Sequence, residues 1–152
     1  MKLTTGEMIA EAAKKWIGTP YQNNTMVHGV GVDCSYLLVA AVVDSGLMKR
    51  DELEIENYSN DWHLHRSEEK YLKYVQKVAD EVPINDIRIG DFLLYQYGRC
   101  ISHGAIYVGN NLVVHAFVDL GVIYSSIDDV LFYDAKGKSR LRAVYRFRKG
   151  GK

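Results

Sequence analysis

A cysteine and two histidines are the residues whose types and positions predict chemistry in this chain. Cys34 opens an apolar run that extends to Val43, and His103 and His115 lie in two short apolar runs further along. Acyl transfer by a thiol requires a nucleophile, an imidazole base and a group that orients the base. These three residues are therefore candidates for a catalytic triad.

Local sequence around Cys34 predicts a helix that begins at this residue. Asp33 is a favourable N-cap, the following run is apolar on every side, and Gly46 supplies a stop. In the first turn of a helix, the unpaired amides and the helix dipole favour an anion. A cysteine there can ionise well below its free pKa of about 8.5, and a paired histidine lowers that pKa further. The alternative, a small buried hydrophobic residue at a helix start, stays open.

The two histidines fall on strands whose alternation places them among apolar neighbours. His103 shares a strand face with Ile101, Ala105 and Tyr107, and His115 shares one with Val113 and Phe117. Taken alone, such a pair is more often structural than catalytic.

Whether the histidines meet depends on the turn between their strands. A three-residue loop of Gly109, Asn110 and Asn111 puts His103 diagonal to His115 on one face, roughly 7–8 Å apart at Cβ. A two-residue loop of Asn110 and Asn111 sends them to opposite faces, unless a bulge corrects the register.

The elements that must position these residues are helices first and strands second. A capping box at Thr4 and Glu7 begins a helix that Gly18 and Pro20 end, and a further helix is capped by Ser67 and closed by Pro83. From Asp91 onward the apolar period is two, which is typical of an antiparallel sheet. The expected strands cover 91–97, 101–108, 112–118, 122–125 and 140–148. The sequence therefore predicts an α+β fold.

Composition predicts one ordinary globular domain, spanning residues 1–152, with 47% hydrophobic and 25% charged residues. The formal net charge of zero gives no reason to expect nucleic acid as a partner. Met1 to Trp16 carries charges throughout, so we expect no signal peptide, and no apolar run is long enough to insert into a membrane. His63 and His65 are two ligands without obvious further partners, so we expect no metal and no cofactor.

Several motifs, in this order along the chain, resemble the NlpC family of papain-like cysteine peptidases that cut peptidoglycan stem peptides. They are Thr19-Pro20-Tyr21, Asp33-Cys34-Ser35, Ile89-Gly90-Asp91-Phe92-Leu93, His103-Gly104-Ala105-Ile106-Tyr107-Val108-Gly109 and Val114-His115-Ala116. Residues 16–47 and 61–66 look most like the branch encoded by phages and prophages beside tail genes.

The resemblance implies a fold and a set of roles. The fold would be papain-like, with the nucleophile at a helix start packed on a C-terminal antiparallel sheet. Cys34 would be the nucleophile, His103 the base and His115 the residue that orients it. Tyr21 would face the substrate and support the oxyanion, and Asp33 and Ser35 match positions that in some members bind a free peptide amine.

Two departures from the family pattern concern substrate preference. Tyr36 stands where the family usually has glycine, and a longer segment, Gln22 to Val30, replaces a Gly-Gly soon after the tyrosine.

The expected activity is hydrolysis of amide bonds in peptidoglycan stem peptides, with phage tail proteins as further partners. The chain would be made in the cytoplasm and act at the cell wall. Two alternatives are a non-catalytic tail or wall-binding component on the same fold, and an amidase or acyltransferase that uses the same triad.

Overall fold

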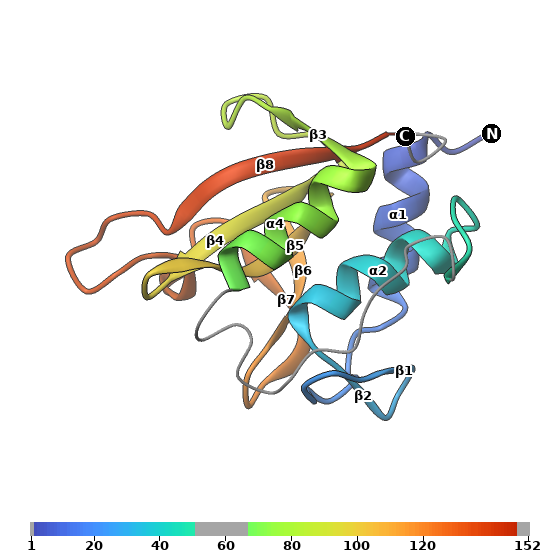
Figure 1. Cartoon of the computed structure of the whole chain (residues 1–152), viewed down its shortest axis with the longest axis horizontal. Coiled ribbons are helices and arrows are strands. Elements are labelled where there is room, and N and C mark those ends of the chain that lie inside the picture. The colour runs from blue at the N-terminus through green and yellow to red at the C-terminus, as the bar shows by residue number, and fades with distance from the viewer. Residues whose placement is uncertain (1, 51–66, 149–152) are drawn as a thin grey trace.

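Within residues 2–50 and 67–148, which the computed structural model describes, three helices pack on one face of a six-stranded antiparallel sheet (Figure 1). The helices are α1 (Thr5–Lys14), α2 (Cys34–Asp44) and α4 (Ser67–Val78). The strands are β3 (Ala79–Val82), β4 (Phe92–Tyr97), β5 (Cys100–Gly109), β6 (Leu112–Phe117), β7 (Gly121–Ser126) and β8 (Leu141–Phe147). They are ordered β3-β8-β4-β5-β6-β7, so β4 to β7 form a continuous meander. The α+β class predicted from the sequence is confirmed.

Both N-terminal helices begin at the predicted caps. Thr4 and Glu7 form a reciprocal capping box at the start of α1. Asp33 caps α2, its carboxylate accepting from the Tyr36 amide at 2.9 Å. The α1 helix ends at Lys14, earlier than predicted, and the chain continues in turns, leaving Ile17 37% exposed.

The predicted strands are all present, each end lying within one residue of its expected position. The predicted end of the helix after Ser67 is wrong. Instead of continuing to Pro83, α4 stops at Val78, and Ala79–Val82 form β3 at the edge of the sheet. Pairing with β8 decides this segment, since Ala79 lies opposite Phe147 and Val82 opposite Val144.

Apolar side chains cover both faces of the sheet. The larger core lies between the helices and the sheet, and it includes Ile9, Leu37, Val75 and Leu94. A smaller core on the opposite face contains Leu93, Tyr95, Ala105, Val113, Phe132 and Val144. Phe132 belongs to the short 3-10 helix η2 (Val130–Phe132), so the segment between β7 and β8 closes this second face.

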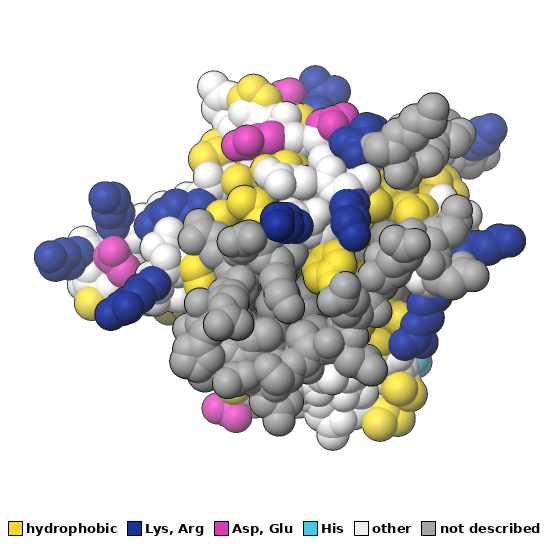
Figure 2. Space-filling model, viewed as in Figure 1, with side chains coloured by type: hydrophobic (Ala, Val, Ile, Leu, Met, Phe, Trp, Pro, Cys, Tyr) yellow, Lys and Arg dark blue, Asp and Glu magenta, His cyan; other side chains and the backbone are white. Residues whose placement is uncertain are grey.

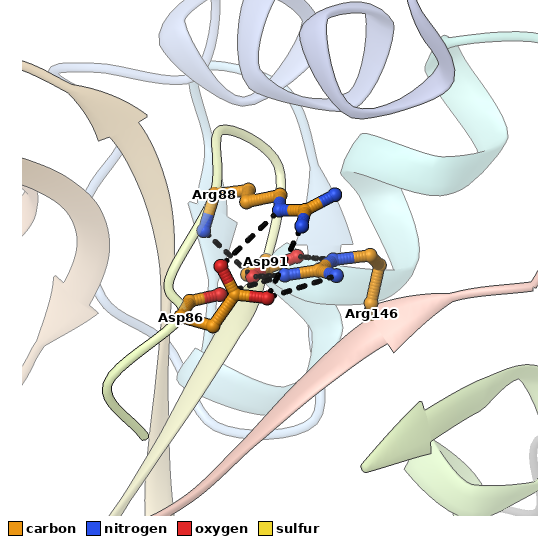
Figure 3. A network of polar contacts seen from close by, with 4 residues as sticks. All are labelled: Asp86, Arg88, Asp91 and Arg146. Atoms are coloured by element: carbon orange, nitrogen blue, oxygen red, sulfur yellow. Dashed lines mark hydrogen bonds and ion pairs between the residues drawn. The ribbon is translucent and has the colours of Figure 1, made fainter. Parts of the chain in front are cut away.

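A partly buried ion pair joins the last strand to the turn that precedes β4. Arg146 donates to both oxygens of Asp91, from Nε and from Nη2, at 2.8 Å each. The Arg88 amide donates to the same carboxylate at 2.8 Å. Figure 3 shows these residues together with Asp86, whose carboxylate binds the Arg88 side chain. The turn is thereby fixed against β8.

The same turn packs directly on α1 through two glycines. A Cβ atom on Gly6 would lie 2.1 Å from the Ile89 carbonyl oxygen, and one on Gly90 would lie 2.3 Å from Gly6 Cα. Gly90 also has a φ of +94°, a conformation that favours glycine. The absence of both side chains is what lets the helix backbone touch the turn.

Charged side chains are dispersed over the face seen in Figure 2. Lys and Arg side chains gather on the projecting loop between η2 and β8, and others are scattered over the rest of this face with fewer Asp and Glu side chains among them. In the described part of the chain, each helix is too short or too polar to cross a bilayer.

Candidate active site

Cys34 is the first residue of α2 and lies against β5. Its side chain is 8% exposed, and its Sγ lies 3.4 Å from the carbonyl oxygen of Ser102. Ser102 directly precedes His103 in the chain. The helix start therefore brings the predicted nucleophile beside the strand segment that carries the predicted base.

A β-bulge at Ser102 shapes this contact. Tyr95 pairs with His103 and Gln96 with Ile101, so Ser102 is an extra residue in β5. Bulges bend a strand locally and re-aim side chains. The prediction that Ile101 shares the face of His103 is wrong for this reason: Ile101 lies in the core under the helices, whereas His103 contacts Tyr95 in the opposite layer.

A second bulge resolves the question of the loop between β5 and β6. Asn110 and Asn111 form a two-residue loop with φ values of 56° and 62°, and Gly109 pairs with Leu112. By itself this loop would put the histidines on opposite faces. Val108, the residue before Gly109, is bulged out of the pairing. Tyr107 therefore pairs with Val113, and the bulge returns the two histidines to one face of the sheet.

The corrected register joins the two histidines directly. His103 Nε2 and His115 Nδ1 are 2.9 Å apart, and the rings meet edge to face with centroids 5.1 Å apart. His115 Nε2 lies in turn 2.8 Å from the hydroxyl of Ser125 on β7. Both imidazoles are buried, with 5% and 0% exposure. The structure thus forms a hydrogen-bonded row across three neighbouring strands.

Burial keeps both imidazoles neutral near pH 7. Loss of hydration, together with the charge that His115 would carry, lowers the pKa of His103 well below its ordinary value of 6.5. Burial lowers the pKa of His115 to about 4, although Asp129 opposes this shift. Aromatic rings of Tyr97, Phe117 and Phe132 surround the pair and exclude water from it. A neutral imidazole is the form that can accept a proton.

Tyr21 is held beside the start of α2. Its backbone bridges to Val32, and the bonds from Val32 to Pro20 and from Gln22 to Val32 fold this segment back on itself. The phenol lies close enough to the Cys34 side chain to interact with it. Burial, and then the negative charges of Cys34 and Asp33, raise the pKa of Tyr21 above its ordinary 10.0, so the phenol stays protonated.

Asp33 and Ser35 flank Cys34 and bind each other and the local backbone. Asp33 is 3% exposed and accepts from the Asn24 amide at 2.7 Å and from the Ser35 hydroxyl at 2.9 Å, in addition to its capping bond. The bond to Asn24 anchors the longer segment found in the sequence. Within that segment Met26–Val27 form β1, which pairs with β2 (Gly31–Val32) just after it.

Tyr36, the residue that replaces the usual family glycine, points into the core. Its side chain is 8% exposed and packs in the apolar cluster beneath the helices. Burial is the main cause that raises its pKa, with Asp33 next.

Sequence reasoning missed two residues at this site, Tyr97 and Ser125. The Tyr97 ring lies 5.6 Å from the His103 ring, and the Arg140 guanidinium lies 4.5 Å above the Tyr97 ring. Burial raises the pKa of Tyr97 to about 12, with Arg140 opposing the shift. Ser125 is a polar residue at a strand position that alternation predicts to be buried, and this is the sequence signal that could have identified it.

The described residues contain no cluster of three or more side chains suited to a metal ion. His63 and His65, considered as ligands in the sequence, lie outside the described residues, as does the 61–66 motif. The arrangement can supply a thiol, a neutral base and an orienting partner without a cofactor.

Comparison with protein families finds a model described as the NlpC/P60 family, which matches residues 16–140. A protein of Haemophilus influenzae, named a probable endopeptidase, is 29% identical over 127 residues, covering 80% of this chain and 65% of that protein. A protein of Escherichia coli K12, named murein DD-endopeptidase MepS/murein LD-carboxypeptidase, is 39% identical over 54 residues, covering 36% of this chain and 29% of its own length. The chain thus spans about two thirds or less of these relatives.

Solved structures share the architecture. The NlpC/p60 domain of the peptidoglycan hydrolase SagA superposes with a TM-score of 0.64 at 18% identity, covering 95% of this chain and all of that domain. NlpC1 from Trichomonas vaginalis gives a TM-score of 0.63 at 19% identity, covering 97% of this chain and 45% of that protein. The predicted papain-like fold of the NlpC type is confirmed.

Proposed function

This chain belongs to the NlpC/P60 family, and on that basis we propose that it is a cysteine endopeptidase that hydrolyses amide bonds in peptidoglycan stem peptides. The observation that carries the proposal is the buried bond of 2.9 Å between His103 and His115, together with a thiol at the start of α2 that contacts the carbonyl of Ser102, the residue before His103. The names of the Escherichia coli relative and of SagA, which refer to murein and peptidoglycan, support the substrate class.

In the proposed reaction, His103 is the base. Its Nε2–H donates to His115 Nδ1, which leaves Nδ1 of His103 with a lone pair for the Cys34 proton. The Cys34 thiolate attacks the scissile carbonyl carbon and forms a tetrahedral oxyanion. His103 then protonates the leaving amine as the C–N bond breaks. Water attacks the remaining thioester, gives its proton to His103, and frees the acid and the thiol.

Two groups are proposed to stabilise the oxyanion. Backbone amides at the start of α2 present the positive end of the helix dipole. The Tyr21 phenol, protonated and next to Cys34, is a second donor. Asp33 and Ser35 are proposed to line the adjacent substrate position, where the carboxylate and hydroxyl would face a peptide amine.

Digestion of purified muropeptides, followed by mass spectrometry, tests this function. The wild-type chain is expected to release two fragments that together exceed the parent mass by one water. Cys34→Ala is expected to lose turnover by at least about 10³-fold while it keeps its fold. Cys100→Ala, which removes the other thiol of the chain, is the matched control and is expected to cleave normally. Cleavage by Cys34→Ala contradicts the proposal, and an inert wild type favours a non-catalytic wall-binding role.

We also propose that the chain acts at the cell wall as part of a phage or prophage tail. The support is the resemblance of residues 16–47 to the tail-associated branch. Mass spectrometry of purified virions or induced prophage particles is expected to find the chain among tail proteins. Its consistent absence from such particles contradicts this part of the proposal.

A further inference from the structure

Ser125 is a buried polar residue on β7 whose hydroxyl meets the histidine pair from the far side. It is 6% exposed, and its Oγ lies 2.8 Å from Nε2 of His115. Ser125 pairs with Val113 and His115 pairs with Ile123, so Ser125 and His115 are diagonal neighbours on one face of the sheet. Ser125 therefore continues the row that begins at His103.

We propose that Ser125 is a positioning residue that fixes the tautomer of His115, and through it the tautomer of His103. This inference rests on the proposed function, because it states which atoms donate and which accept in the hydrogen bonds that join His103, His115 and Ser125. The Ser125 oxygen accepts from His115 Nε2–H, and its own proton points away from the imidazole.

The direction of these hydrogen bonds follows from the number of protons on the two neutral imidazoles. Two neutral histidines have one proton to share across the Nε2 to Nδ1 contact. If His103 donates, its Nδ1 is a bare acceptor, and His115 must carry its proton on Nε2, facing Ser125. If Ser125 donates to Nε2 instead, His115 holds its proton on Nδ1 and donates to His103. The base would then carry its own proton on Nδ1 and could not accept one from a thiol.

Ser125 is the polar side chain that contacts Nε2 of His115. His115 is 0% exposed, and its ring has Phe117 at 5.7 Å and Phe132 at 5.1 Å between centroids. Apolar rings offer no hydrogen bond to Nε2, and a buried N–H without an acceptor is costly. The hydroxyl supplies that acceptor, so it removes the free-energy penalty that the productive tautomer would carry beside apolar rings alone.

Three variants separate positioning from packing. Ser125→Ala removes the hydroxyl, Ser125→Thr keeps it and adds a methyl group, and Ser126→Ala is the matched control on the exposed neighbour in the same strand. Nitrogen-15 NMR of the histidine rings at pH 7.5 reports the tautomers directly, without activity. Steady-state cleavage of muropeptides gives kcat and KM.

The wild type, Ser125→Thr and Ser126→Ala are expected to show a single tautomer for His115, with the proton on Nε2. Ser125→Ala is expected to show a mixture, with kcat lower by roughly 10-fold and KM unchanged, because one hydrogen bond is lost. A wild-type spectrum with the proton on Nδ1 overturns the inference, as does Ser125→Ala with the same ring signals as wild type. An inactive wild type with the expected spectrum refutes the proposed function and leaves the tautomer assignment standing.

Discussion

Arg146 holds the carboxylate of Asp91 with two nitrogen atoms, across the junction between β8 and the turn that leads into β4. Two parallel N–H to O bonds fix orientation as well as distance. Asp91 is 1% exposed, so its carboxylate depends on protein groups for compensation of its charge. The strand that follows carries Tyr95 and Tyr97, which contact His103. The pair therefore supports the site from a distance.

Loss of this pair is expected to destabilise the fold. Arg146→Leu leaves a buried carboxylate without its cation, which we expect to lower the free energy of unfolding by about 2–4 kcal/mol, since the Arg146 side chain is 31% exposed. Urea denaturation measures the change. Lys14→Leu, which removes an exposed ion pair with Glu11, is the control and is expected to cost less than about 1 kcal/mol. Equal losses in both variants would show that burial of Asp91 is unimportant.

Stability is expected to fall as the pH falls below 6.5. The unfolded chain protonates His115 near pH 6.5, whereas the folded chain does so at a pKa of about 4, so the unfolded state binds more protons between these values. The loss accumulates to roughly 3 kcal/mol by pH 4 and is absent above pH 7. His103 adds to it in the same direction.

Urea denaturation from pH 7.5 to 4.5 tests this dependence. His115→Asn removes the titrating ring, so its stability should change less with pH than that of the wild type. Parallel curves for the two proteins would mean that the buried imidazole does not contribute.

Activity is expected to persist in acid beyond the range of an ordinary histidine. The lowered pKa of His103 keeps the base neutral below pH 6.5. The acid limb of kcat/KM should therefore lie below pH 6.5, measured on muropeptides from pH 4.5 to 7.5. Each sample is returned to pH 7 and assayed again, so that unfolding is not mistaken for protonation. An acid limb at pH 6.5 or above contradicts the expectation.

The Tyr21 hydroxyl is expected to act on the transition state. Tyr21→Phe keeps the ring but loses the donor next to Cys34, and we expect kcat to fall about 10–100-fold with little change in KM. The exposed Tyr124 supplies a matched control, because Tyr124→Phe removes a hydroxyl on β7 without touching the site. A rise in KM at constant kcat would assign Tyr21 to substrate binding alone.

Local signals in the sequence predicted the parts of the fold that local interactions decide. Thr4 and Asp33 cap their helices because their side chains bond backbone amides within three residues. Short apolar runs separated by turn residues after Asp91 located the strands, because both faces of the sheet pack on a core. These rules require no knowledge of distant partners.

Features that depend on distant partners could not be predicted. The segment Ala79–Val82 continues the apolar pattern of a helix, and pairing with β8 makes it a strand. The bulges at Ser102 and Val108 follow from how β4 and β6 pair with β5, which periodicity does not encode. Ser125 could not be assigned to His115 without the register of β6 against β7.

Because Val108 is bulged, the orientation of the β6 side chains depends on whether the link between β5 and β6 has an odd or an even number of residues. Deleting Val108 would keep the tight asparagine turn and nearly the same composition, yet every side chain on β6 would exchange its inward and outward orientation. A foreign loop grafted here can vary in length only by steps of two. Alanine scanning would never reveal this constraint, because it preserves the count of residues.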